Sequence, residues 1–214
     1  AAVAVCVGVW WATRTERVTL AAGAGEKRTL LLPDSSRVTL AGGTELSYAA
    51  GFESREVEMS GKAYFEVRSG DGAPFTVSTR ALRVTALGTA FQVETVGGAT
   101  EVSVERGRVR VTATDTRRDT TLSAGMAAAY ERGEGRLRVE KDYDANRTSW
   151  KTGVLRFEGA PLREVVARLN EHYRAGVRVP REWEELELTA TFSGATLGEA
   201  LEIINETLDI RLTE

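Results

Sequence analysis

The sequence VTALGTAFQVETVGGATEVSVERGRVRVTA, residues 84–113, contains the alternation of apolar and polar residues that is typical of most of this 214-residue chain. Apolar residues occupy every second position of its runs, as at Phe91/Val93, Val102/Val104 and Val109/Val111. A period of two places alternate side chains on one face of a strand. Glycines at Gly97-Gly98 and Gly107 separate the runs as hairpin turns do. The stretch therefore predicts consecutive β-strands.

The same alternation runs from Arg17 to about Glu140, broken every ten or so positions by turn-forming residues such as Pro33-Asp34 and Gly42-Gly43. No helical period longer than one turn occurs in this part of the sequence. We therefore predict a mainly β N-terminal domain over residues 15–142.

Beyond a polar stretch at residues 143–149, which we interpret as a linker, the pattern changes to a duplicated unit. The segments FEGAPLREVVARLNE (Phe157–Glu171) and FSGATLGEALEIINE (Phe192–Glu206) match at a constant offset along the chain. In each copy a short strand precedes an amphipathic helix and another strand follows, which predicts a small α+β domain of βαβ-βαβ order at residues 150–214. The predicted strands are Val154–Phe157, Val177–Val179, Leu186–Phe192 and Ile210–Thr213.

The composition is typical of a globular protein and excludes several classes of function. The chain has 28 basic and 31 acidic side chains, and no long basic run that could contact nucleic-acid phosphates. One cysteine and one histidine exclude an intrachain disulfide, a cysteine-based zinc site and any mechanism with two imidazoles. Nucleophile-elbow, phosphate-loop and dinucleotide motifs are absent from the sequence. We therefore expect no enzyme turnover, no cofactor and no metal.

Residues 1–14 begin with an uncharged apolar run, AAVAVCVGVWWA (Ala1–Ala12). The run is shorter than the roughly 20 residues that span a bilayer. We interpret it as the end of a truncated transmembrane helix, with Trp10 and Trp11 at the membrane interface. The core of a signal peptide and a buried strand are the alternatives.

Six stretches, in their order and spacing, resemble the FecR family of membrane-anchored anti-sigma regulators. They are LPDSSRVTL (Leu32–Leu40), SGKAYFEV (Ser60–Val67), PFTVST (Pro74–Thr79), VTALGTAFQV (Val84–Val93), EVSVERGRVRV (Glu101–Val111) and WKTGVLRFEGAPLREVVARLNEHY (Trp150–Tyr173). The resemblance implies a twisted, solenoid-like stack of antiparallel strands for the β domain. It also implies that the C-terminal unit is similar to the secretin/TonB short N-terminal (STN) domain. The family's cytoplasmic sigma-binding segment is not in this sequence, so we expect the chain to be the outer portion.

What the resemblance implies about function is a signal relay. In this family the periplasmic signalling domain of a TonB-dependent outer-membrane transporter contacts the C-terminal part of the regulator. The regulator is anchored in the inner membrane and controls an extracytoplasmic-function (ECF) sigma factor. For this chain we expect an inner-membrane location with its bulk in the periplasm.

Some relatives also cleave themselves between a glycine and a threonine, and Gly88-Thr89 falls on the matching motif. The alternative is that Gly88 serves a tight turn or a bulge between two strands.

Strand addition or helix docking on the C-terminal domain is the expected binding mode, because an open sheet edge leaves main-chain groups unpaired. The two candidate edges are Leu186–Phe192 and Asp209–Thr213. The candidate partner-binding residues are Trp183, Leu188, Thr189, Thr191, Asp209, Ile210, Arg211 and Thr213. A cell-envelope carbohydrate-binding β module with exposed aromatic residues is the alternative function, and a small-molecule sensor pocket in the β part is a third.

Overall fold

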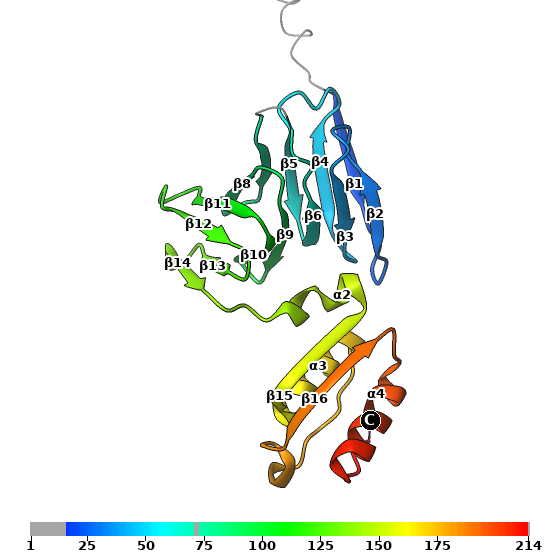
Figure 1. The fold of residues 1–214 in the computed structure, drawn as a ribbon. Coiled ribbons are helices and arrows are strands. Elements are labelled where there is room, and N and C mark those ends of the chain that lie inside the picture. The colour runs from blue at the N-terminus through cyan, green and yellow to red at the C-terminus, as the bar shows by residue number, and fades with distance from the viewer. Residues whose placement is uncertain (1–15, 71–72, 214) are drawn as a thin grey trace, which may run out of the picture. The chain divides into compact units, whose positions relative to one another are not determined.

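The computed structural model describes residues 16–70 and 73–213, which form two compact units divided between Tyr143 and Asp144 (Figure 1). Residues 1–14, expected to be the end of a transmembrane helix, lie outside the described residues. Within the described ranges, none of the helices is both long enough and apolar enough to cross a membrane.

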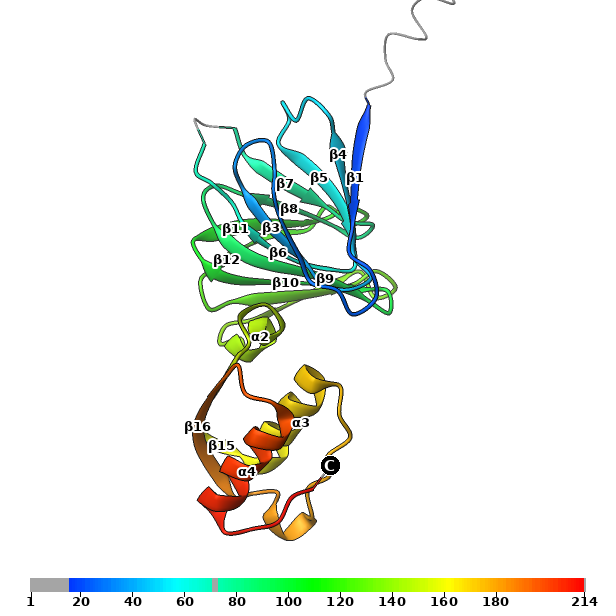
Figure 2. The same ribbon diagram turned by 90° about the vertical axis from the view of Figure 1, so that its right-hand side faces the viewer.

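The first unit consists of two seven-stranded sheets (Figure 2). The strands of one sheet are, in spatial order, β1 (Arg17–Ala21), β4 (Glu45–Ala49), β5 (Glu56–Ser60), β7 (Phe75–Ser78), β8 (Leu82–Ala86), β11 (Arg108–Ala113) and β12 (Asp119–Ser123). Those of the other are β2 (Arg28–Leu31), β3 (Arg37–Leu40), β6 (Lys62–Glu66), β9 (Ala90–Val96), β10 (Ala99–Arg106), β13 (Ala127–Glu131) and β14 (Arg136–Glu140).

Strand order in both sheets follows the sequence, because the chain crosses from one sheet to the other after every one or two strands. The β part is therefore a progressive stack whose two sheets are open at both ends. Pairing is antiparallel except between β5 and β7, which are parallel. The expectation of a wholly antiparallel stack was wrong at this pair. The chain leaves β5 for β6 in the other sheet before it returns to β7, and such a crossover allows two neighbouring strands to run in the same direction.

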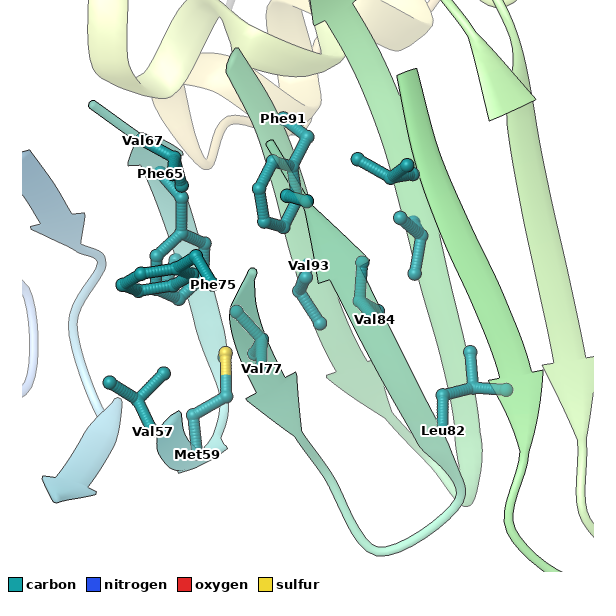
Figure 3. Close-up of a cluster of buried hydrophobic side chains, with 14 of the residues drawn as sticks. Val57, Met59, Phe65, Val67, Phe75, Val77, Leu82, Val84, Phe91 and Val93 are labelled. Carbon is teal, nitrogen blue, oxygen red and sulfur yellow. The ribbon is translucent and has the colours of Figure 1, made fainter. Parts of the chain in front are cut away.

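The inward faces of the two sheets enclose one apolar core (Figure 3). Phe65 of β6 contacts Phe75 of β7 across the core with ring centroids 6.0 Å apart, and it stacks on Phe91 of β9 at 5.3 Å. Valines such as Val77 and Val93 are fully buried between the sheets. The alternation read from the sequence thus corresponds to the inward and outward faces of each strand.

A buried ion pair connects the loops at one end of this unit. The Arg55 guanidinium donates from Nε and Nη2 to one carboxylate oxygen of Asp34, at 2.9 and 2.8 Å. It also donates to the main-chain carbonyls of Arg68 and Ala73, at 2.8 and 2.6 Å. Both charged side chains are about nine-tenths buried. Each polar atom of the guanidinium is thereby matched to an acceptor, as a buried charge requires.

Asp34 belongs to the LPDSS motif, and its carboxylate also shapes that turn. It accepts hydrogen bonds from the main-chain N–H and the hydroxyl of Ser36, at 2.9 and 2.8 Å. Ser35 between them adopts a φ of 66°, a left-handed conformation that glycine takes more readily. The motif is therefore a turn whose acidic residue is neutralised by an arginine from a different loop.

The second unit has a two-stranded antiparallel sheet, β15 (Val154–Pro161) and β16 (Glu187–Ser193), with α3 (Leu162–Tyr173) and α4 (Leu197–Leu208) packed against it. Short helical turns occur at η1 (Ala145–Thr148), α2 (Ser149–Thr152) and η2 (Arg181–Trp183). Phe157 and Phe192, the first residues of the two repeats, meet edge to face at 6.0 Å. The duplicated sequence therefore builds one shared core, separate from that of the first unit.

Residues 143–149, expected as a linker, are not an irregular connection. The Asp144 side chain accepts from the N–H of Asn146 and caps η1. The Asn146 amide then exchanges two hydrogen bonds of 2.8 Å with the main chain of Arg156 in β15. Polar residues that sequence alone assigns to a linker serve here as caps and bridges within the second unit.

The predicted strands Val177–Val179 and Ile210–Thr213 are not strands, so the expected βαβ-βαβ order was wrong in its second and fourth strands. Both segments are held by side chains instead of a ladder. The amide of Asn170 exchanges two hydrogen bonds with the main chain of Val177, at 2.8 and 2.9 Å. Asn205 does the same to Leu212, at 3.0 and 2.7 Å. An asparagine at the same position of each repeat thus takes the place of a neighbouring strand.

We expect Asp34→Ala to lower the free energy of unfolding of the first unit by about 3–5 kcal/mol, because it leaves the buried Arg55 charge without its counter-ion. The matched control is Glu58→Ala, which removes an exposed pair with Arg17 and should cost less than about 1 kcal/mol. Urea unfolding followed by far-ultraviolet circular dichroism measures both. Equal losses in the two variants would contradict the role given to this pair.

The paired hydrogen bonds from Asn170 to Val177 and from Asn205 to Leu212, which we call the asparagine clamps, give a second prediction. Asn205→Ala leaves the N–H and C=O of the buried Leu212 unpaired, so we expect a loss of about 1–3 kcal/mol in the second unit. Thr207→Ala, at an exposed position of the same helix, is the control and should change stability by less than about 0.5 kcal/mol. Thermal unfolding of the fragment 144–214, whose two tryptophans are Trp150 and Trp183, reports on this unit by fluorescence. An unchanged midpoint for Asn205→Ala would refute the clamp.

Candidate functional site

The two copies of the C-terminal repeat are related by an approximate two-fold axis through the small sheet. Arg156 of β15 pairs with Thr191 of β16, which is its own equivalent in the second copy. Leu155 pairs with Phe192, the equivalent of Phe157. An antiparallel pair in which a residue meets its own equivalent is two-fold symmetric. The helices and the segments after them therefore lie around a common axis.

The structure places the predicted contact residues in two separate groups. Thr189 and Thr191 are exposed on β16, whereas Leu188 of the same strand is completely buried in the core. Trp183 is half-buried in η2 and packs against the core. A partner could reach the two threonines directly, but reaching Leu188 would require the unit to unfold.

The second group follows α4. Asp209 is exposed and ends the helix in a left-handed conformation with φ of 51°. Arg211 and Thr213 are also exposed, while Ile210 is half-buried against the core. This segment runs from the helix end through the Asn205 clamp, and its exposed side chains are those at alternate positions.

A cavity of about 330 Å³ brings this second group next to the segment that follows α3. It is lined by Gly176, Arg178, Pro180, Arg211, Leu212 and Thr213. Sequence reasoning identified Arg211 and Thr213 but missed Arg178. The signal for Arg178 was present in the repeat, because Arg178 occupies the position equivalent to Thr213 and lies between the inward-facing Val177 and Val179.

β15 and β16 have only each other as neighbours in the described part of the chain, so each also has an outer edge. Part of this sheet is interrupted by a bulge, where the register shifts between Phe157 and Ala160. There the N–H of Gly159, at a φ of 57°, donates to the Thr189 hydroxyl at 2.8 Å. Thr189 is therefore exposed, and its hydroxyl also stabilises the bulge.

Comparison with protein families accounts for both units. Residues 18–110 match the model of the FecR protein family, and residues 154–214 match that of the FecR C-terminal region. The chain belongs to the FecR family.

Two crystal structures from Parabacteroides distasonis, each assigned as an anti-sigma factor, are similar to this FecR-family chain over most of its length. One is 25% identical with a TM-score of 0.64, and the likeness covers 93% of this chain and 95% of that one. The other is 27% identical with a TM-score of 0.63 and covers 92% and 94%. No curated protein matches the chain.

Gly88 and Thr89, in the sequence LGTAF (Leu87–Phe91), lie between β8 and β9. Gly88 adopts a φ of 65°, and a side-chain carbon there would lie 2.0 Å from the Ser69 hydroxyl, so a glycine is required. Thr89 is only 1% exposed and its Oγ1 has no hydrogen-bond partner. The methyl group of Thr89 faces Gly107, where an added side-chain carbon would lie 2.8 Å from that methyl group. The turn thus holds a buried, unpaired hydroxyl beside a peptide bond in a constrained loop.

Electrostatics in the FecR C-terminal unit centre on the start of α4. Hydrogen bonds from the Thr196 main chain and hydroxyl lower the pKa of the Glu199 carboxyl, as expected for a capping box. Burial raises the pKa of Tyr173, whose hydroxyl donates to the Ala195 carbonyl at 2.6 Å. Both groups stabilise the chain just before α4, and neither lines the cavity that contains Arg178.

Proposed function

We propose that this chain is the periplasmic signal-relay portion of an inner-membrane anti-sigma regulator, which receives its signal from a TonB-dependent outer-membrane transducer and controls an ECF sigma factor. The observation that carries the proposal is that FecR models match both units in the order of the family. The similarity to structures assigned as anti-sigma factors supports a role in sigma-factor regulation.

In this proposal the second unit is an STN-like domain that receives the transducer's signalling domain. Its open edges support binding without chemistry, because unpaired main-chain groups can accept a strand from another protein. The candidate edges are β16 and the segment Asp209–Thr213. The first unit then serves as the rigid body between this domain and the membrane-proximal end of the chain.

A carbohydrate-binding module is less well supported. Sugar binding commonly uses an exposed aromatic ring as an apolar platform. In residues 16–70 and 73–213 every tryptophan, tyrosine and phenylalanine is buried or half-buried. A polar groove of about 460 Å³ on the first sheet is lined by residues such as Glu45, Glu58 and Arg83, with no aromatic residue.

The relay is tested by calorimetric titration of the chain with the periplasmic signalling domain of the TonB-dependent transporter encoded nearby. We expect one-to-one binding that the fragment 144–214 retains, since this fragment keeps its own core and the Asp144 cap. The fragment 16–143 is the control and should not bind. Absence of binding by the whole chain would reject direct contact for that pair.

We further propose that the chain undergoes one self-cleavage between Gly88 and Thr89. The supporting observation is the buried Thr89 hydroxyl without a partner. Attack of Oγ1 on the Gly88 carbonyl carbon forms an ester, breaks the C–N bond and passes the hydroxyl proton to the released amine. Water then hydrolyses the ester, which leaves a carboxylate on Gly88 and restores the Thr89 hydroxyl.

Denaturing gels of the purified chain test this proposal. We expect two fragments, residues 1–88 and 89–214, which Thr89→Val abolishes and Thr89→Ser retains. Ser103→Ala is the matched control, because Ser103 is the other buried hydroxyl without a partner in the described residues, and its cleavage should equal that of the unchanged chain. If the unchanged chain stays intact during prolonged incubation, self-cleavage is not a property of this protein.

A further inference from the structure

The segments that follow the two helices share a strand-like alternation although neither is a strand. In residues 177–179 the valines pack against the core while Arg178 between them is exposed. In residues 210–213 Leu212 is buried while Arg211 and Thr213 are exposed. Figure 2 shows both segments on the side of α3 and α4 opposite β15 and β16. They line the same cavity.

The asparagine clamps determine which main-chain groups remain available. In extended backbone the N–H and C=O of one residue point to one side, and those of the next residue point to the other. Asn170 takes both groups of Val177, and Asn205 takes both groups of Leu212. The main-chain groups of Arg178 and Arg211 are therefore directed away from the clamps. Within the described residues they have no hydrogen-bond partner.

The charges of this surface are also unbalanced. Neither Arg178 nor Arg211 forms an ion pair with an acidic residue in the described part of the chain. Two other arginines of the unit do so, since Arg163 pairs with Glu185 and Arg168 pairs with Asp144. Two guanidinium groups without acidic partners at one cavity form a local basic site. The second unit as a whole, by contrast, has more acidic than basic residues.

We propose that this surface, Arg178 and Arg211 with their main chains, binds an extended acidic segment of a partner protein by strand addition. Main-chain groups of the incoming segment would pair with those of Arg178 or Arg211, and its alternate carboxylates would meet the guanidinium groups. The identification of that partner as the transducer's signalling domain rests on the proposed function; the chemistry of the site does not.

A protein segment fits these observations better than an isolated anion. A phosphate or a single carboxylate would satisfy the guanidinium groups but would leave the main-chain donors and acceptors of both segments unpaired. An extended peptide satisfies both sets at once. The charge of the site also predicts that affinity falls as salt concentration rises.

Two synthetic peptides test the chemistry on the 214-residue chain. One is an acetylated and amidated octapeptide of alternating glutamate and threonine, and the other has lysine in place of each glutamate. We expect the acidic peptide to shift the amide NMR signals of Arg178 and Arg211 saturably, and the basic peptide to leave them unchanged. Equal effects of both peptides, or no shift of these amides with the acidic one, would overturn the proposal.

Charge reversal provides the matched variants. Arg178→Glu with Arg211→Glu should weaken binding of the acidic peptide at least tenfold and confer binding of the basic one, with an unchanged melting temperature because both side chains are exposed. Arg156→Glu, an exposed arginine of β15, is the control and should leave acidic-peptide binding within twofold. Retained acidic-peptide binding in the double variant would overturn the assignment of this site.

Titration of the same variants with the transporter's signalling domain separates the two proposals. Loss of its binding in the double variant but not in Arg156→Glu supports both. If that domain binds the double variant as it binds the unchanged chain, the relay stands and this surface is not its contact. If that domain does not bind the unchanged chain while the acidic peptide does, the relay fails and the acidic-segment site stands.

Discussion

The path of the chain between the two sheets of the first unit depends on the buried ion pair between Arg55 and Asp34. Arg55 precedes β5, and its carbonyl accepts the N–H of Thr76, a hydrogen bond that extends the parallel pairing of β5 and β7. Its guanidinium binds the carbonyls of Arg68 and Ala73, which lie in the crossover from β6 back to β7. One side chain thus fixes both ends of the crossover and joins them to the turn at Asp34. Because a buried charge is costly without its partners, this side chain couples the three loops energetically.

A different constraint shapes the second unit. Its two-fold symmetry duplicates a strand, a helix and an asparagine, and the asparagine replaces the strand neighbour that each post-helix segment would otherwise need. A side-chain amide presents one donor and one acceptor, which suffices for a single residue of extended backbone. The residues on either side keep unpaired groups. The same device that stabilises the unit therefore leaves a surface suited to binding.

Much of this architecture could be predicted from the sequence. The parts that could not be predicted have a physical cause in common. Alternation of apolar residues is local, so it revealed the β unit and the inward and outward positions of each strand. It could not reveal that β5 and β7 run parallel, because that depends on which sheet β6 joins. Nor could it distinguish a strand at Val177–Val179 from extended backbone held by Asn170. Alternation could also have separated the candidate contact residues. Leu188 lies at an inward position of its strand and could have been excluded as a contact, whereas Arg178 lies at an outward position and could have been included.

The order of strands along both sheets has a mechanical consequence. Strands early in the sequence lie at one end of the stack and late strands at the other, so the end strands with a single neighbour are β1 and β2 at one end and β12 and β14 at the other. Tension applied between Glu16 and Tyr143 would load those outer strands first and separate them from the stack one at a time. A stack of this kind yields gradually from its ends, while its centre around Phe65 and Phe91 keeps its shape until last.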